Sequence, residues 1–349
     1  MIPWSKVIIL QIKKNLKYFL ASPRITAAAS KRVHYAVAVL MYHDLSENDD
    51  IDSWLRVSKR LFELQLKELS GNCNFIRPDD LFQRDNLYRE RLNVLITFDD
   101  GFVNQYRLAL PVLEKLQIPA LFFLSTENIQ TGDIFWFDRV ITPIQVLKIA
   151  SLDLTQVGLR KYEISAKDST KRWDDIQVLL EDIKAKGNDT SYDVKRILAY
   201  FDEKFGDLLM TLLGDYRPLV EDEITAMRRS GLCYFGSHSH RHEILTYLSD
   251  EEIKNNLSKS KHYIETLLGE RIDHFSYPNG NTDRRVSTLC RKHGFHYGYV
   301  TAQGLVTQNT DRMLIPRISV GGYDSVETVL CKINKQLIKT ALSRSKHQK

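Results

Sequence analysis

The sequence predicts an α/β protein whose parallel strands form a sheet or a barrel. Three observations lead to this prediction. An apolar strand at residues 94–98 is followed by a helix and by another strand at residues 120–124. The alternation stops near residue 132, gives way to helical periodicity, and resumes after residue 223. A helix between consecutive strands favours parallel pairing, and ligands then bind at the carboxyl ends of the strands.

Three strands are predicted in the first half of the core. Residues 35–41 form the first, and the helix that follows has one apolar face and ends near Gly71. The central strand, residues 94–98, is rich in β-branched residues and is continued by a helix that ends at Leu116. Residues 120–124 complete this half.

Helix caps mark the second half of the core. Gly231, at the C′ position, ends a helix over residues 221–230. The capping box from Ser249 to Glu252 opens a helix that ends at Gly269. The remaining predicted strands, or strand ends, are at residues 233–236, 275–280, 295–301 and 313–320.

The predicted domain organisation has one large domain with basic ends. It consists of a basic amphipathic segment at residues 1–35, a domain at residues 36–330 and a basic tail at residues 331–349. A helical insertion occupies about residues 132–223 of that domain. It opens with an aromatic cluster around Trp136, which can line a sugar-binding wall, although hydrophobic core is the commoner role of such a cluster.

Composition is ordinary for a globular protein. The chain is 43% hydrophobic and 27% charged. Its length of 349 residues suffices for one large domain or two smaller ones. Four cysteines lie far apart without CxxC spacing. That spacing argues against a structural zinc site and favours a reducing compartment, while two disulfides in an exported protein stay open.

Positive charge is concentrated at the amino terminus. Residues 1–35 contain seven Lys or Arg and no acid, so a net charge of +5 leaves about −2 for the rest. This excludes a protein-wide basic field for nucleic acid. A basic amphipathic helix within residues 1–30 predicts contact with a membrane surface, while a packed terminal helix or a transit peptide has the same pattern. We expect a cytoplasmic protein, peripheral on the inner face of the membrane, with export left open.

Acidic and imidazole side chains follow two predicted strands. Asp99 and Asp100 are adjacent at the end of the central strand, where two like charges are costly without a cation. His238 and His242 are four residues apart, a spacing that lets both imidazoles bind one metal ion. One aspartate can supply a third ligand and the other can act as general base.

Either motif by itself has a simpler interpretation. Two adjacent aspartates at a strand end are most often a cap or a turn, and a short histidine-rich run is more often adventitious than catalytic. Here both follow strands, and together they provide two histidines, a carboxylate ligand and a base. The combination favours a catalytic metal site with an open position for water.

These residues resemble a known family, the metal-dependent polysaccharide deacetylases of carbohydrate esterase type. Residues 97–101, Thr-Phe-Asp-Asp-Gly, resemble the first family motif, and residues 238–242, His-Ser-His-Arg-His, resemble the second. The resemblance extends to residues 40–43, 275–280 and 314–318. It implies a distorted, incomplete (β/α) barrel interrupted by the helical insertion.

The resemblance also implies roles for individual residues. Asp99 would be the general base, and Asp100, His238 and His242 would bind one divalent metal ion, with zinc favoured. Metal-bound water would attack an acetyl carbonyl while Asp99 takes its proton. The backbone N–H of Asn279 would stabilise the oxyanion.

The sequence departs from the family pattern at two points. Ser276 stands where the third motif has an arginine that orients the base, and Arg317 is our candidate to replace it. The late Leu-x-His motif, which supplies the general acid, is absent. His43 at the end of the first strand can replace that acid, contact the substrate or be structural.

We therefore expect a hydrolase that removes N-acetyl groups from amino sugars of a polysaccharide or its lipid-linked precursor. Tyr277, Pro278 and Trp136 are the predicted saccharide contacts. One alternative is a carbohydrate-binding relative with weak or no catalysis. Another is a hydrolase of a different non-peptide C–N bond.

Overall fold

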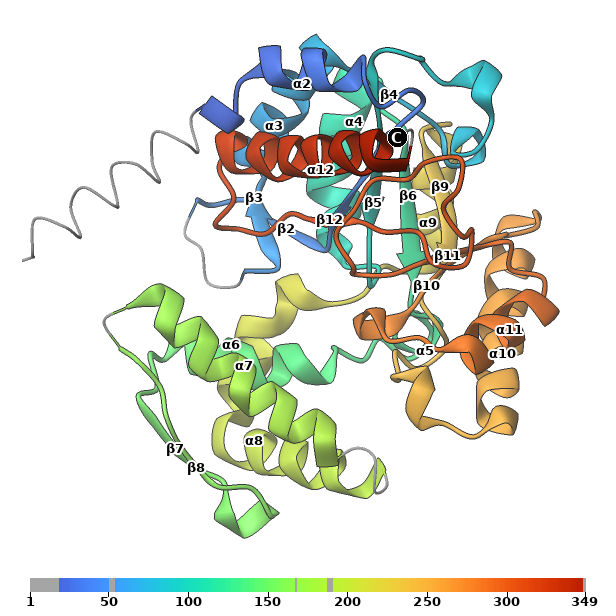
Figure 1. Cartoon of the computed structure of the whole chain (residues 1–349). Helices are drawn as coiled ribbons and strands as arrows, with labels where there is room; N and C mark the ends of the chain where they lie inside the picture. Colours follow the sequence, from blue (N-terminus) through green and yellow to red (C-terminus); the bar gives the residue numbers. More distant parts are fainter. Residues whose placement is uncertain (1–18, 50–53, 167, 187–190, 348–349) are drawn as a thin grey trace, which may run out of the picture.

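A parallel sheet organises the structure, a computed structural model that describes residues 19–49, 54–166, 168–186 and 191–347 (Figure 1). Its strand order is β11-β10-β9-β6-β5-β1-β12, with β4 also paired to β5, and every pair is parallel. The strands are β1 (Val37–Tyr42), β4 (Cys73–Phe75), β5 (Leu92–Phe98), β6 (Ala120–Leu124), β9 (Cys233–Ser237), β10 (His274–Ser276), β11 (Tyr297–Tyr299) and β12 (Ile318–Ser319).

The segment at residues 315–319 closes the sheet toward a barrel. The N–H of Ile315 donates to the carbonyl of Gly298, in the middle of β11, at 2.8 Å. A few residues later, β12 pairs with β1. Pro316 lies between the two contacts and has no N–H to donate, so this side of the barrel stays short. The predicted distorted, incomplete (β/α) barrel is confirmed.

The central strands are buried throughout, as parallel strands covered on both faces must be. Every residue of β1, β5 and β6 is buried, and the rings of Phe98 and Phe122 stack at 5.0 Å across neighbouring strands. Thr97, a polar residue in this core, donates its hydroxyl to the Leu40 carbonyl at 2.9 Å. The predicted run at residues 94–98 is thus the centre of the barrel.

Helices surround the barrel. They are α2 (Pro23–Ser30), α3 (Lys59–Asn72), α4 (Leu110–Leu116), α5 (Thr126–Thr131), α9 (Glu221–Arg229), α10 (Asp250–Leu268), α11 (Arg284–Lys292) and α12 (Val326–His347). A π-helical stretch, Gln105–Ala109, precedes α4. No helix among the described residues is long and apolar enough to cross a membrane.

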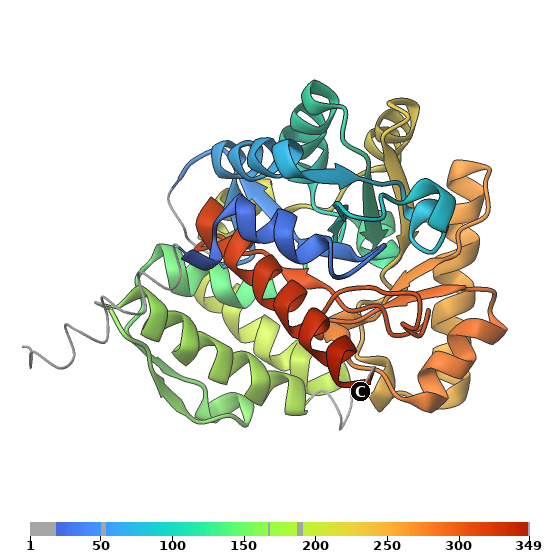
Figure 2. The ribbon, with the colours of Figure 1, turned by 45° about the horizontal axis from the view of Figure 1, so that its top comes forward.

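Helices α2 and α12, near the two ends of the described part of the chain, belong to the same core as the barrel. Helix α12 lies beside α2 (Figure 2), and the hydroxyl of Thr26 donates to Asn334 Oδ1 at 2.8 Å. Ile333 and Leu337 are fully buried. The predicted boundary at residues 330/331 therefore falls inside a packed helix. The predicted membrane-binding pattern lies mainly in residues 1–18, outside the described residues.

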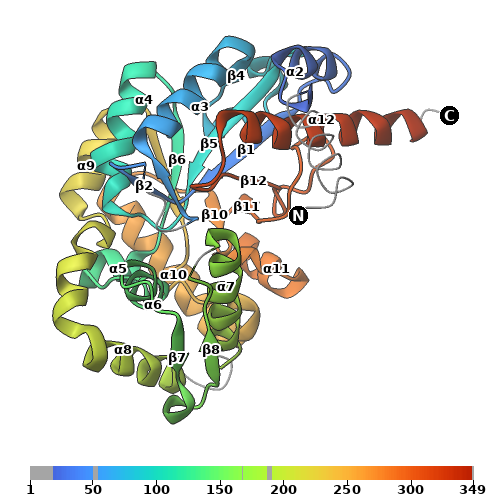
Figure 3. The same cartoon turned by 90° about the vertical axis from the view of Figure 1, so that its left-hand side faces the viewer.

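The insertion packs around a hydrophobic cluster of its own. It contains α6 (Trp136–Val146), the antiparallel pair β7 (Ser151–Asp153) and β8 (Lys161–Glu163), α7 (Ser169–Lys186) and α8 (Ser191–Leu212). Figures 1 and 3 show it beneath the end of the sheet at which the central strands finish. The β7–β8 hairpin was not predicted, because its strands are only three residues long.

Candidate active site

The candidate site lies at the carboxyl edge of the sheet. His43 follows β1, Asp99 follows β5, and His238 follows β9. Ser276 is the last residue of β10, and Arg317 directly precedes β12. Most of these strands finish at one edge of the sheet, and the short β12 begins there beside the end of β1. Asp99 and Arg317, more than 200 residues apart in sequence, therefore meet at this edge.

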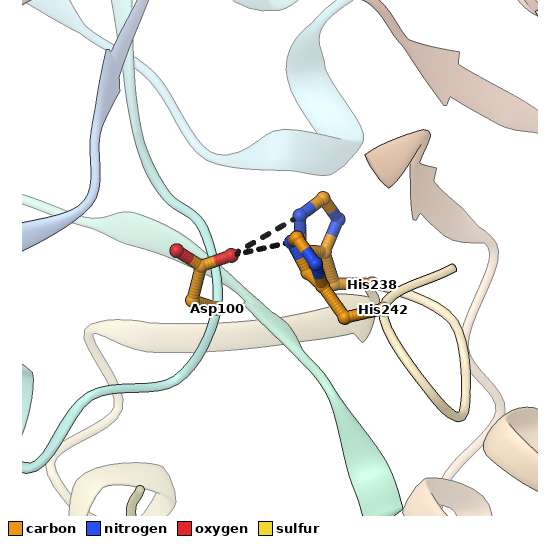
Figure 4. Close-up of side chains that lie close together, drawn as sticks. All are labelled: Asp100, His238 and His242. Carbon is orange, nitrogen blue, oxygen red and sulfur yellow. Dashed lines mark ion pairs between the residues drawn. The ribbon is translucent and has the colours of Figure 1, made fainter. Parts of the chain in front are cut away.

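Asp100, His238 and His242 converge on one point (Figure 4). Asp100 Oδ1 lies 3.1 Å from His242 Nε2 and 3.3 Å from His238 Nε2. Ligands about 2.0–2.2 Å from a tetrahedral ion are about 3.3–3.6 Å from one another. The two distances from Asp100 are therefore close to the spacing of ligands around one small cation, and all three ligand atoms lie within 4.8 Å of one another. Among the described residues no other group of this kind occurs, and His240 is not part of it.

The tautomer of His238 also fits a cation. Its Nδ1 lies 2.8 Å from the carbonyl oxygen of Ser276, which can only accept, so Nδ1 carries the hydrogen. In the neutral ring, Nε2 then presents a lone pair toward the Asp100 carboxylate. A cation between them would bind both groups, and a backbone partner on the far nitrogen is usual for a metal-binding histidine. The residues present therefore fit a divalent metal ion.

The two histidines lie on a tight loop. Ser239 Oγ accepts a hydrogen bond from the His242 N–H at 2.9 Å, and the Ser239 N–H donates to Ser237 Oγ at 3.1 Å. Ser239 and His242 have φ values of 68° and 53°, and Asp100 has a φ of 75°. Left-handed backbone at non-glycine residues is costly, and such strain is concentrated at functional sites. Here it accompanies the convergence of the three side chains.

Asp99 is held by a buried arginine. Arg317 Nη1 and Nη2 donate to Asp99 Oδ1 and Oδ2 at 2.7 and 2.8 Å, and Arg317 is fully buried. Ser276 Oγ donates to Asp99 Oδ2 at 3.3 Å and accepts from Arg317 Nη2 at 3.0 Å. A guanidinium in two-point contact fixes the plane of a carboxylate. Arg317 thus reaches Asp99, and Ser276 fills the space beside them.

The charges around both aspartates keep them ionised. Burial raises the pKa of Asp99, but the positive charge of Arg317 and that of His238 in its protonated form outweigh burial and hold that pKa below its usual value. Burial likewise raises the pKa of Asp100, and hydrogen bonds to His238 and His242 hold it well below its usual value. Two neighbouring carboxylates can therefore coexist here, because a cationic group faces each of them.

His43 lies near the same carboxylates. Burial lowers its pKa and outweighs the attraction of Asp100 and Asp99, so the pKa stays below its usual value. The ring lies 5.9 Å from the ring of Trp54, at an interplanar angle of 60°. This environment favours a neutral imidazole. A role as acid, substrate contact or structural residue remains a prediction.

The strand end at β10 corrects part of the predicted saccharide-binding set. The Tyr277 side chain is fully buried, 5.3 Å from the Phe275 ring, and a Cβ on Gly298 would lie 2.6 Å from its hydroxyl. Pro278 is buried as well. Side chains alternate along a strand, so Ser276 faces Asp99 while Phe275 and Tyr277 face the core. The prediction that the Tyr277 and Pro278 side chains bind substrate is wrong.

Asn279 lies at the turn that follows. Its φ is 58°, and its Oδ1 accepts a hydrogen bond from Lys184 Nζ of α7 at 2.9 Å. Gly280 has a φ of 77°, and a Cβ there would lie 2.1 Å from Thr301 Oγ1. The turn is therefore held between the barrel and the insertion. The role of the Asn279 N–H toward an oxyanion remains a prediction.

The aromatic cluster at the start of the insertion packs against the His242 side of the site. Phe135 and Phe137 are buried, and their rings lie 5.4 and 5.5 Å from the ring of His242. Their proximity to a histidine was not predicted, since their sequence pattern indicates hydrophobic core or a sugar-binding wall and does not specify a contact with the histidine loop. Trp136 is half-buried, 5.8 Å from the Phe137 ring, and its contact with a saccharide remains a prediction.

Comparison with known proteins assigns the family. The sequence profile of the polysaccharide deacetylases matches residues 89–298, which is more than half of the chain. The chain belongs to the polysaccharide deacetylase family. The matched region contains Asp99, Asp100, His238 and His242. Polysaccharide deacetylases of this type are metal-dependent, and the three-ligand group described above is suited to such an ion.

Two similar proteins are named as deacetylases. YxkH of Bacillus subtilis, named as a polysaccharide deacetylase, is 36% identical over 95 residues, or 26% of this chain. That match spans only about a third of YxkH, 32% of its length. The poly-β-1,6-N-acetyl-D-glucosamine N-deacetylase of Staphylococcus epidermidis is 28% identical over 227 residues, covering 59% of this chain and 74% of that protein.

Solved structures agree with the fold. The deacetylase PplD of Streptococcus pyogenes has a TM-score of 0.57 at 16% identity, covering 85% of this chain and 98% of that one. IcaB from Ammonifex degensii has a TM-score of 0.56 at 18% identity, covering 86% and 98%. At these identities the similarity shows a common (β/α) barrel fold.

Proposed function

We propose that the protein removes N-acetyl groups from amino sugars of a polysaccharide or of its lipid-linked precursor. The observation that carries this proposal is the position of Asp99, which is ionised and oriented by Arg317 directly beside the group formed by Asp100, His238 and His242. The name of the S. epidermidis relative supports an N-acetylglucosamine polymer as the substrate class.

Each residue of the site has a chemical task in this proposal. Asp100, His238 and His242 would hold a divalent ion, with zinc favoured, and the ion supplies Lewis-acid chemistry that polarises a carbonyl and lowers the pKa of water. Asp99 accepts the proton of the attacking water. Arg317 keeps the Asp99 carboxylate charged and correctly oriented through its two hydrogen bonds.

Two further protein groups complete the reaction. The N–H of Asn279 donates a hydrogen bond to the oxyanion that develops on the acetyl carbonyl. The departing amine needs a proton, and Asp99, once protonated by the attacking water, can return it. His43 could do so only from its protonated form, which its environment disfavours. The surrounding loops and the insertion then select and orient the substrate.

Removal of the metal tests the proposal. Treatment with a chelator is expected to bring acetate release from N-acetylglucosamine oligomers, β-1,4- and β-1,6-linked, to background, and added zinc is expected to restore it. Metal content measured by elemental analysis should be close to one ion per chain, and His238→Ala should lose that ion. The physical reason is that two of three protein ligands cannot hold the ion at the site.

The neighbouring His240→Ala provides a matched control. Its imidazole does not belong to the three-ligand group, so this variant should retain both the ion and acetate release. A wild-type protein that binds metal but releases no acetate would favour a binding function or a different C–N substrate. Full activity of metal-free protein would refute the proposed chemistry.

A further inference from the structure

Helix α7 of the insertion contacts the site at two points. Near its start, the ring of Trp173 lies 6.1 Å from that of Trp54, which in turn lies 5.9 Å from His43. Near its end, Lys184 Nζ donates to Asn279 Oδ1 at 2.9 Å. The helix therefore runs from the His43 side of the site to the Asn279 side.

The spacing of these two residues places them on one stripe of the helix. Trp173 and Lys184 are eleven residues apart, close to three full turns and about 16 Å along the axis. The adjoining side of α7 is anchored, since Ile176, Leu179 and Ile183 belong to the hydrophobic cluster of the insertion, against which Trp173 also packs. One face of the helix thus packs on the hydrophobic cluster of the insertion, and another face lies toward the barrel.

The indole pair is rigidly supported on the barrel side. The carbonyl of Trp54 accepts a hydrogen bond from the Gly322 N–H at 2.7 Å. A Cβ on Gly321 would lie 2.5 Å from the same carbonyl, so only glycine allows this approach. Both indoles are half-buried, which leaves part of each ring accessible. A preformed aromatic surface loses little conformational entropy when it binds a ligand.

Such a surface suits a particular ligand chemistry. The ring C–H groups of a pyranose are apolar and can pack on an indole, while its hydroxyls stay hydrated or meet polar groups. Trp54 adjoins His43, beside the carboxylates, and Trp173 adjoins Trp54; neither takes part in the three-ligand group. They are thus placed to contact a sugar next to the one that reacts.

We propose that Trp54 and Trp173 form a binding platform for a sugar unit adjacent to the reacting one. The insertion would then set a requirement for substrate length: two or more linked sugars bind well and a single sugar binds poorly. This inference rests on the proposed function and extends it, since it assigns to α7 a contribution to substrate selection.

A series of substrate lengths tests the platform. For Trp173→Ala we expect KM to rise about tenfold to fiftyfold with tri- to pentasaccharides of N-acetylglucosamine, and kcat to change little, since the indole binds substrate away from the reacting bond. With the monosaccharide, kcat/KM should stay within about twofold of wild type. Trp173→Phe should recover most of the loss. Val178→Ala, an exposed position on the same helix, is the matched control.

A binding measurement separates this inference from the proposed reaction. Calorimetric titration of Asp99→Asn protein with the pentasaccharide, with and without Trp173→Ala, reports affinity without turnover. An unchanged affinity, or an equal loss at all substrate lengths, would overturn the platform. Weaker binding in Trp173→Ala supports it even if wild type releases no acetate, an outcome that would count against the proposed reaction alone.

Discussion

Asp99→Asn is expected to reduce kcat for acetate release by about 10²- to 10⁴-fold, the range typical of the loss of a general base. The amide has nearly the same shape but cannot accept the proton of the attacking water. Asp100, His238 and His242 are untouched, so the metal content should remain that of wild type. Acetate assays at substrate saturation, together with elemental analysis, measure the two effects separately.

Ser276→Ala provides a graded comparison. It removes only the hydroxyl contact to Asp99 at 3.3 Å and keeps the two bonds from Arg317, so a loss of less than about tenfold is expected. Circular dichroism should establish that both variants are folded. The assignment of Asp99 as base fails if Asp99→Asn retains more than about a tenth of the wild-type rate.

Arg317→Met is expected to lower the free energy of unfolding by about 3–5 kcal/mol, because it leaves the buried Asp99 carboxylate without its cation. Acetate release should fall as well, since the plane of the base is no longer fixed. Urea denaturation at neutral pH measures the first effect. The double variant with Asp99→Asn should lose much less than the sum of the single losses, because no unpaired charge remains.

Arg291→Met is the matched control for Arg317→Met. Arg291 pairs with Asp311 at the surface, where ion pairs contribute at most about 1 kcal/mol.

The pKa of Asp99 is lowered in the folded state, so the stabilisation from its pair is present above the ordinary Asp pKa and is lost as pH falls through the folded-state pKa. The difference between wild type and Arg317→Met should therefore shrink in acid. A neutral-pH loss below about 1 kcal/mol would contradict the buried pair.

Local sequence was sufficient for the central strands and for the two histidines, while the family resemblance chose Asp100 over Asp99 as the third ligand. The central strand is a continuous apolar run, and a parallel strand buried on both faces needs no other pattern. Asp100 directly follows that strand, and both histidines lie on one short loop. The positions of these side chains are therefore largely fixed by the strands that they follow. Arg317 was a weaker inference, drawn from the arginine missing at Ser276.

Other features depend on which residues the fold brings together. Tyr277 was mistaken for a saccharide contact because its neighbours resemble a motif. Strand alternation places it opposite Ser276, in the core. Phe135 reaches His242, and Trp173 reaches Trp54, only because the insertion folds back on the barrel edge. Apolar periodicity specifies that such residues are buried but not which partners they meet.

The amino-acid sequence by itself determined the strand and helix rhythm and the α/β class, because these depend on residues close together in the chain. Its two local motifs supplied the candidate ligands, and the family resemblance chose Asp100 among them. Tertiary structure alone decided how the barrel closes through residues 315–319 and which face of α7 adjoins the site. It also decided that Lys184 holds the turn at Asn279. These contacts join segments separated by many tens of residues, and only the packing of whole elements against one another sets them.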